Sequence, residues 1–144
     1  MPMATPRKLI AVIDDDASIR NALSRQMRAA GFRTLAFQCA EEFLSVAASC
    51  DAGLVISDIH LGTMSGLDLA VHPQVIELQL PVVLISGCND PLISAKAQEV
   101  AAVFLQKPIP PGKLLEAVID TLGSPLVEVD DESGRISPSR SAAI

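Results

Sequence analysis

The order of apolar and polar residues predicts five strands that alternate with five helices. Five short apolar runs are each followed by a segment in which apolar residues recur every three or four positions, the spacing of an amphipathic helix. The runs interpreted as strands are residues 9–13, 32–37, 53–57, 81–86 and 101–106. Strand–helix units in succession imply a parallel sheet with helices on both faces. The predicted fold class is therefore α/β, with a doubly wound sheet.

Capping residues indicate where the first and third helices begin. Asp16 or Ser18 can cap the first helix, and Gly31 can end it. Ser65 and Asp68 have the spacing of a capping box at the start of the third helix. The first helix is therefore expected to begin directly after the first strand, and the third after a loop that follows Asp58.

Prolines occur in or at the start of the third, fourth and fifth predicted helices. Pro73 falls within the third helix, where it removes a backbone hydrogen bond, so we expect a kink or an early end there. Asp90 with Pro91 forms a favourable N-cap and first turn for the fourth helix, and Pro111 opens the fifth. The second helix is predicted over residues 40–48, where the apolar positions again have helical spacing.

Composition suits one α/β domain with an aliphatic core. Of the 144 residues, 49% are apolar but only 3% are aromatic, so Val, Leu, Ile and Ala must fill a buried parallel sheet. The strand–helix pattern ends at residue 123, and the ordered domain is placed at residues 7–123. Residues 1–6 are expected to be a loose arm, and the acidic segment 124–144 a disordered tail.

Charge and cysteine content narrow the possible partners and location. The net charge is −6 and no basic stripe is present, which argues against nucleic-acid binding by this chain. The three cysteines are scattered and include no CxxC pair, which is typical of reduced thiols in the cytoplasm. Apolar runs are too short for a signal peptide or a membrane span. We therefore expect a cytoplasmic protein that makes no membrane contact.

Polar side chains follow four of the five predicted strands. Asp14 and Asp15 follow the first strand, Asp58 the third, Ser86 ends the fourth and Lys107 follows the fifth. The carboxyl ends of parallel strands share one edge of the sheet, where ligands bind in open α/β folds. These five side chains are therefore expected to lie close together.

Three close carboxylates need either a proton or a cation. Each pair repels by roughly 4 kcal/mol at about 4 Å with an effective dielectric constant of about 20. A cluster of hard oxygens suits Mg²⁺, and one Asp that stays ionised can then attack phosphorus to form an aspartyl phosphate. Lys107 could neutralise charge on the phosphoryl oxygens, and Ser86 could donate a hydrogen bond to one of them.

Each of these residues also has a simpler explanation when it is taken singly. Residues 14–16 could only cap a helix, and Ser86 or Lys107 could be ordinary surface residues at strand ends. The side chain of His60 is expected to belong to a loop and not to a metal site. The occurrence of all the candidates at one edge favours a functional site.

Four segments make the chain resemble the receiver domain of two-component response regulators over residues 7–123. These segments are VIDDD (12–16), SDIHLGTMSG (57–66), VVLISG (82–87) and FLQKP (104–108). The resemblance implies a flavodoxin-like (βα)5 fold with strand order 2-1-3-4-5. It also implies a self-phosphorylating and self-dephosphorylating switch, not a turnover enzyme, that is phosphorylated by a sensor histidine kinase or a histidine phosphotransfer protein.

The resemblance also implies the ligands of the cation and the phosphoacceptor. Asp58 would accept the phosphoryl group. Asp14, Asp15 and Asp58 would hold Mg²⁺ together with the backbone carbonyl of His60.

The residues expected to respond to phosphorylation follow from the same resemblance. Lys107 would pair with the phosphoryl group, Ser86 would move toward it, and Phe104 would turn inward. The peptide bond before Pro108 would be cis. The output would be a downstream protein partner or a self-dimer, bound through the fourth helix, the fifth strand and the fifth helix. The alternative that the chain is a fragment of a larger DNA-binding regulator stays open.

Several positions depart from the usual receiver pattern. Gly62 and Thr63 stand where Pro and Gly are common, and Cys39 stands at a usual Ser-type helix cap. Cys88 and Asn89 follow Ser86, in a region that often tunes the lifetime of the phosphoryl group. These differences bear on rates and on the output surface.

A second hypothesis is a phosphatase of the haloacid dehalogenase-like class with Asp14 as the nucleophile. The segment Asp14-x-Asp16-x-Ser18 imitates the D-x-D-x-S/T motif of that class. Such an enzyme needs a further acidic pair after the lysine, and the candidates, Asp130 and Asp131, lie in the polar tail. This hypothesis also leaves the carboxylate after the third strand without a function.

Overall fold

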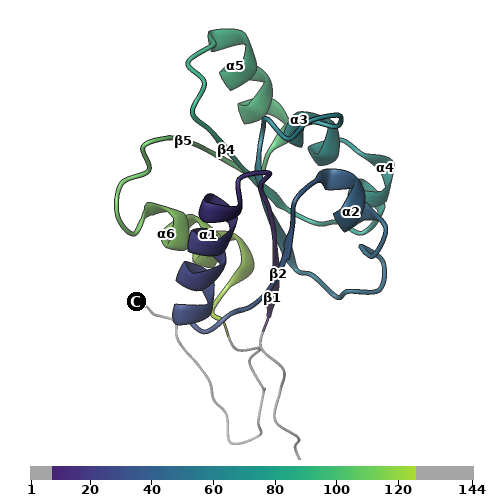
Figure 1. The fold of residues 1–144 in the computed structure, drawn as a ribbon, viewed down its shortest axis with the longest axis vertical. Coiled ribbons are helices and arrows are strands. Elements are labelled where there is room, and N and C mark those ends of the chain that lie inside the picture. Colours follow the sequence, from purple (N-terminus) through teal and green to yellow (C-terminus); the bar gives the residue numbers. More distant parts are fainter. Residues whose placement is uncertain (1–7, 126–144) are drawn as a thin grey trace, which may run out of the picture.

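The computed structural model describes residues 8–125, which form a parallel five-stranded sheet between two layers of helices (Figure 1). The strands are β1 (Leu9–Ile13), β2 (Arg33–Phe37), β3 (Leu54–Asp58), β4 (Val82–Ser86) and β5 (Val103–Gln106). Their order is β2-β1-β3-β4-β5, which confirms the predicted fold. Because every neighbouring pair is parallel, all the carboxyl ends lie at one edge of the sheet. The predicted arm and residues 126–144 of the predicted tail lie outside the described residues.

Helices cover both faces of the sheet. Figure 1 shows α1 and α6 on one side and α2, α3, α4 and α5 on the other. Their bounds are α1 (Ala17–Ala29), α2 (Ala40–Leu44), α3 (Gly66–Ala70), α4 (Pro73–Glu77), α5 (Pro91–Val100) and α6 (Lys113–Leu122). None of the helices in residues 8–125 is long and apolar enough to cross a bilayer.

The side chains of β1 show how the two faces are filled. Ile10 and Val12 pack into the cluster beneath α1 and α6, and Ala11 and Ile13 pack into the cluster beneath α2–α5. All four side chains are fully buried. A strand covered on both faces has no solvent-facing positions, which explains why its sequence is continuously apolar.

Side-chain caps begin α1 and α3, the helices that follow β1 and β3. Asp16, and not Ser18, caps α1: its Oδ1 accepts the N–H of Ser18 at 2.8 Å. The predicted capping box is present, since Ser65 Oγ accepts the N–H of Asp68 at 3.1 Å and the Asp68 carboxylate accepts the N–H of Ser65 at 3.2 Å. These caps satisfy N–H groups that the first helical turn leaves without partners.

A separate helix begins at Pro73. The expected early end is confirmed, because α3 stops at Ala70, but Pro73 does not lie inside a helix as predicted. It is the first residue of α4, where its missing N–H costs no helical hydrogen bond. The Nδ1 of His72 caps this helix by accepting the N–H of Gln74 at 3.1 Å.

The second helix is shorter than the predicted 40–48. It stops at Leu44, and turns follow to residue 49. The hydroxyl of Ser45 donates to the carbonyl of Glu42 at 2.7 Å, and that of Ser49 donates to the carbonyl of Val46 at 3.2 Å. Serine hydroxyls that bond nearby carbonyls compete with the helical pattern.

The last helix and all the strands except β1 begin later in the chain than predicted, β3 and β4 by one position each. The last helix begins at Lys113 and not at Pro111, because Gly112 at its N-cap is left-handed (φ 81°). Strand β5 begins two positions late because the N–H of Ala101 still bonds to α5, at the carbonyl of Ala97 (2.9 Å). Strand β2 begins one position late because the N–H of Phe32 bonds back to α1, at the carbonyl of Met27 (3.1 Å).

Candidate functional site

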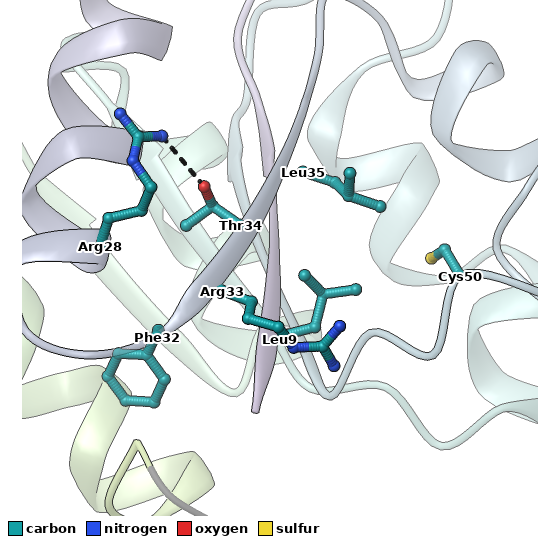
Figure 2. Close-up of a pocket in the computed structure, with 7 residues that line it drawn as sticks. All are labelled: Leu9, Arg28, Phe32, Arg33, Thr34, Leu35 and Cys50. Carbon is teal, nitrogen blue, oxygen red and sulfur yellow. Dashed lines mark hydrogen bonds between the residues drawn. The ribbon is translucent and has the colours of Figure 1, made fainter. Parts of the chain in front are cut away.

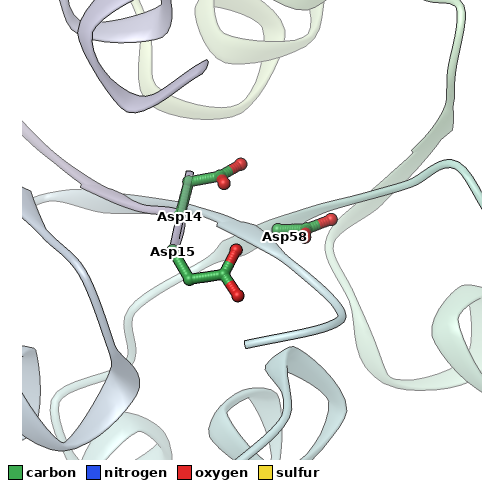
Figure 3. A group of neighbouring side chains, drawn as sticks. All are labelled: Asp14, Asp15 and Asp58. Atoms are coloured by element: carbon green, nitrogen blue, oxygen red, sulfur yellow. The ribbon is translucent and has the colours of Figure 1, made fainter. Parts of the chain in front are cut away.

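Three carboxylates meet at the carboxyl ends of β1 and β3 (Figure 3). Asp14, Asp15 and Asp58 each offer an oxygen, and these oxygens lie within 4.8 Å of one another. The sheet register produces this meeting: Ile13 of β1 pairs with Ser57 of β3, so the residues that follow them, Asp14 and Asp58, are level. The structure thus brings together the three carboxylates that the sequence places at this edge.

The three carboxylates have different surroundings. Asp14 is only 2% exposed, and its Oδ1 accepts the backbone N–H of Asp16 at 2.9 Å. Asp15 is exposed to solvent. The side chain of Asp58 is 13% exposed, so it is largely buried but still open at the edge of the sheet.

Burial disfavours the charged forms of two of these groups. It raises the pKa of Asp14; the hydrogen bond from the N–H of Asp16 and the charge of Lys107 lower this pKa in part, and the negative charges of Asp15 and Asp16 raise it. Burial likewise raises the pKa of Asp58; the positive charge of Lys107 lowers it, and the charge of Asp14 raises it. A cation would relieve this unfavourable charge, and a set of three carboxylate oxygens fits a hard divalent cation such as Mg²⁺.

Lys107 brings a positive charge to the same edge. Its Nζ lies 4.0 Å from Oδ1 of Asp58, and its side chain is 33% exposed. Its backbone N–H donates to the carbonyl of Ser86 at 2.8 Å, which holds the end of β5 against β4. The peptide bond between Lys107 and Pro108 is cis, as the family resemblance implies.

Ser86 and Phe104 lie on the two strands next to the carboxylates. Ser86 is fully buried at the end of β4, and its Oγ accepts the N–H of Cys88 at 3.0 Å. Phe104 of β5 is half-buried against the core cluster beneath α2–α5. In the sheet register Phe104 is level with Leu84, two positions before Ser86.

Gly66 is a residue whose contact with the site the sequence did not reveal. A Cβ atom at this position would lie 2.5 Å from the backbone oxygen of Asp58 and 2.9 Å from Cδ2 of Leu84. Its N–H donates to the carbonyl of Ile59 at 2.8 Å and closes the loop that follows Asp58. The sequence includes Gly66 only in the segment 57–66, because nothing in a local pattern reports contact with a distant strand.

A separate pocket lies at the open edge of the sheet (Figure 2). It has a volume of about 440 Å³ and is lined by Leu9, Arg28, Phe32, Arg33, Thr34, Leu35 and Cys50. A hydrogen bond of 3.2 Å from Arg28 to Thr34 joins α1 to β2 on one side of it. The pocket lies toward the amino-terminal end of β1, opposite the end that carries Asp14, so it is not part of the carboxylate site.

Comparison with known proteins agrees with this fold. Residues 10–119 match the response regulator receiver domain. The chain belongs to this family. Nodulation protein W of Bradyrhizobium diazoefficiens is 30% identical over 117 residues, which are 81% of this chain and 52% of that protein. The transcriptional regulatory protein TdiR of Thauera aromatica is 33% identical over 76% of this chain and 48% of that protein.

A solved structure shows the same receiver fold. The signal receiver domain of an HD domain-containing protein from Pseudomonas fluorescens Pf-5 superimposes with a TM-score of 0.74 at 26% identity, covering 81% of this chain and 94% of that one. The present chain spans about half the length of the two curated relatives above.

The receiver structure also bears on the phosphatase hypothesis. The second acidic residue of the imitated motif, Asp16, uses its Oδ1 to cap α1, with hydrogen bonds to the N–H groups of Ser18 and Ile19. The candidates for the further acidic pair, Asp130 and Asp131, lie outside the described residues. The family match and the capping role of Asp16 both favour the receiver interpretation over the phosphatase.

Proposed function

We propose that this receiver domain is a phosphorylation switch in which Asp58 accepts a phosphoryl group. The donor is a phosphohistidine on a sensor histidine kinase or a histidine phosphotransfer protein. The observation that carries the proposal is the setting of Asp58, whose carboxylate lies within 4.8 Å of those of Asp14 and Asp15 and 4.0 Å from the Lys107 ammonium group. Two-component receivers are the family to which the chain belongs.

Asp58 is the best nucleophile of the three carboxylates. Asp14 is more deeply buried, and one of its oxygens already accepts the N–H of Asp16. Asp15 is exposed to solvent. The ammonium group of Lys107 lies near the carboxylate of Asp58. Asp58 therefore combines partial access with a positive charge near the position that the transferred group takes.

The transfer is a displacement at phosphorus. An oxygen of the ionised Asp58 carboxylate forms a bond to phosphorus while the bond between phosphorus and the imidazole nitrogen breaks, and its electron pair stays on the imidazole. The product is an acyl phosphate. Water later attacks phosphorus, inorganic phosphate leaves, and the carboxylate is restored. Lys107 offsets the negative charge of the phosphoryl oxygens throughout.

The cation site belongs to the same proposal. Asp14, Asp15 and Asp58 would hold Mg²⁺ together with the backbone carbonyl of His60. When bound, Mg²⁺ neutralises the negative charge that accumulates between carboxylates and a phosphoryl group. The raised pKa values of Asp14 and Asp58 support this assignment, since they report buried negative charge that a cation would stabilise.

Ser86 and Phe104 are the proposed switch residues. The hydroxyl of Ser86 turns toward the phosphoryl group, and Phe104 turns inward to fill the space that this movement opens. Such a response requires two arrangements of different affinity for the phosphoryl group. The fully buried position of Ser86 at the end of β4 and the half-buried position of Phe104 on β5 support these roles.

The proposed output surface is formed by α5, β5 and α6. It binds a downstream protein partner or a second copy of the chain. Leu92 on α5 is 80% exposed and Ile119 on α6 is 40% exposed, so apolar side chains are available there for contact. Light scattering of the phosphorylated and unphosphorylated protein tests the self-dimer directly, since a doubled mass on phosphorylation is expected only for that output.

A second output is control of transcription as part of a larger regulator. The observation that favours it is that this chain spans 48% of the transcriptional regulatory protein TdiR. In such a regulator the receiver acts on a DNA-binding region outside these residues. The receiver chemistry at Asp58 is the same for both outputs.

Intact-protein mass spectrometry tests the proposed chemistry. The wild-type protein, Asp58→Asn and the matched control Asp120→Asn are each incubated with Mg²⁺ and acetyl phosphate. We expect one added phosphoryl group in the wild type and in the control, and none in Asp58→Asn or after addition of EDTA. Phosphorylation that persists in Asp58→Asn would contradict the proposal.

A further inference from the structure

Gln106 connects the end of β5 to the loop that follows Ser86. Its side-chain nitrogen Nε2 donates to the carbonyl of Cys88 at 3.0 Å and also to Oδ1 of Asn89. In the sheet register Gln106 pairs with Ser86, and it directly precedes Lys107. One side chain thus joins the strand that carries the lysine to the loop after the serine.

The orientation of the Gln106 amide follows from its partners. The backbone oxygen of Cys88 can only accept a hydrogen bond, so the Gln106 atom facing it must be the NH₂ group. The same NH₂ group has a second hydrogen to give to Asn89. Both donors of the amide are therefore directed at the loop.

The held loop in turn contacts the hydroxyl group of Ser86. The backbone N–H of Cys88 donates to Ser86 Oγ at 3.0 Å. Beyond the loop, the N–H of Asp90 contacts Sγ of Cys88 at 3.4 Å, and Oδ1 of Asp90 caps α5 at the N–H of Leu92 (2.9 Å). The loop is thus fixed at Ser86 and at α5, and Gln106 holds its middle.

We propose that Gln106 is a positioning residue that stabilises the unphosphorylated arrangement of Ser86. The inference rests on the proposed function, in which the Ser86 hydroxyl turns toward the phosphoryl group on Asp58. That turn must weaken the hydrogen bond from Cys88, and Gln106 holds Cys88 where this bond forms. Removing the hydrogen bonds of Gln106 shifts the equilibrium toward the phosphorylated arrangement, because it destabilises only the competing state.

The test measures the affinity for beryllium fluoride, a noncovalent mimic of a phosphoryl group on a carboxylate, in the presence of Mg²⁺. Gln106→Met keeps the length of the side chain and removes both hydrogen bonds. We expect the Kd from titration calorimetry to become roughly fivefold tighter than in the wild type, since these two hydrogen bonds stabilise the unphosphorylated arrangement alone. Asn89→Ala removes one of the two acceptors and gives a smaller shift in the same direction.

A second measurement uses the protein without Mg²⁺ or beryllium fluoride. In Gln106→Met the backbone N–H of Cys88 exchanges with deuterium several-fold faster than in the wild type, because the loop that places it is no longer held. Gln26→Met is the matched control: Gln26 is an exposed glutamine on α1, and we expect no change in either measurement.

The outcomes separate this inference from the proposed function. If the wild type binds beryllium fluoride and Gln106→Met binds it equally or more weakly, the role of Gln106 is wrong and the phosphoacceptor proposal stands. If the wild type with Mg²⁺ does not bind beryllium fluoride, both are overturned. Tighter binding in Gln106→Met but not in Gln26→Met supports the inference.

Discussion

The ammonium nitrogen of Lys107 lies 4.0 Å from Oδ1 of Asp58, across the end of the strand that separates them. Asp58 ends β3 and Lys107 follows β5, with β4 between these strands in the sheet. This distance lets the lysine attract negative charge, but it is longer than a normal hydrogen bond. In the proposed mechanism the Asp58 oxygen therefore stays available to phosphorus. The relationship places a positive charge where, in the proposed function, the transferred phosphoryl group would bring negative charge.

Replacing this lysine tests its electrostatic role. We expect Lys107→Met to slow the phosphorylation of Asp58 by acetyl phosphate by about 100-fold, because a preorganised positive charge is lost. Lys96→Met is the control: Lys96 is an exposed residue of α5 that pairs with Glu99 at 3.5 Å, and its loss leaves the rate unchanged. Time-resolved intact mass measures both rates. An unchanged rate in Lys107→Met would rule out the assigned role.

Neutralising Asp58 is expected to stabilise the protein in the absence of Mg²⁺. The folded-state pKa of Asp58 is raised above its ordinary value of 3.8 by burial, so folding favours the protonated form. The charged form opposes folding once the pH exceeds that raised pKa. Asp58→Asn removes this cost and gains about 1 kcal/mol in the free energy of unfolding at neutral pH.

The difference in the free energy of unfolding between Asp58→Asn and the wild type is expected to depend on pH. Below 3.8 the Asp58 carboxyl is neutral in both the folded and the unfolded chain, so the wild type and Asp58→Asn differ least there. The advantage of Asp58→Asn grows as the pH rises from 3.8 through the raised pKa, and Mg²⁺ reduces it. Urea unfolding in EDTA at a series of pH values measures the difference. An advantage that shrinks as the pH rises would contradict the raised pKa.

Gly66 is expected to tolerate no side chain. A methyl group there meets the backbone oxygen of Asp58 at 2.5 Å, and a backbone atom cannot move aside cheaply. Gly66→Ala therefore lowers the free energy of unfolding by about 2 kcal/mol. Gly87→Ala is the control, since its added Cβ meets Cδ of Lys107 at an ordinary 3.7 Å. Equal unfolding curves for the two variants would show that the loop after Asp58 accommodates the methyl group.

The cap of α2 offers a stabilising substitution. Cys39 occupies the N-cap with extended backbone angles (φ −151°, ψ 163°), and its side chain makes no capping hydrogen bond. Cys39→Ser supplies a hydroxyl that can accept an N–H of the first turn, and we expect a gain of about 0.5–1 kcal/mol. The reverse test is Ser65→Ala, which removes the existing cap of α3 and costs about 1 kcal/mol. Thermal unfolding measures both, and a loss of stability in Cys39→Ser would be the contrary result.

The carboxylate edge was predictable from the sequence because its residues directly follow strands. Asp14, Asp58 and Lys107 each come at the end of an apolar run, and in a parallel sheet all such ends meet. The contacts of Gly66 and Gln106 were not predictable, because each depends on how a loop folds back on a distant strand. The start of a separate helix at Pro73 was missed for a related reason: periodicity shows that a helix is interrupted, but not that a new N-cap forms at His72.

Direct mapping of the phosphorylated residue tests the central claim most sharply. The protein is phosphorylated by acetyl phosphate with Mg²⁺ and reduced with borohydride, which converts a phosphorylated aspartate to homoserine, and peptide mass spectrometry locates the change. We predict homoserine at position 58 in the wild type, and none at any position in Asp58→Asn. Homoserine at position 14 would instead support the phosphatase-like use of Asp14 and would contradict Asp58 as the phosphoacceptor.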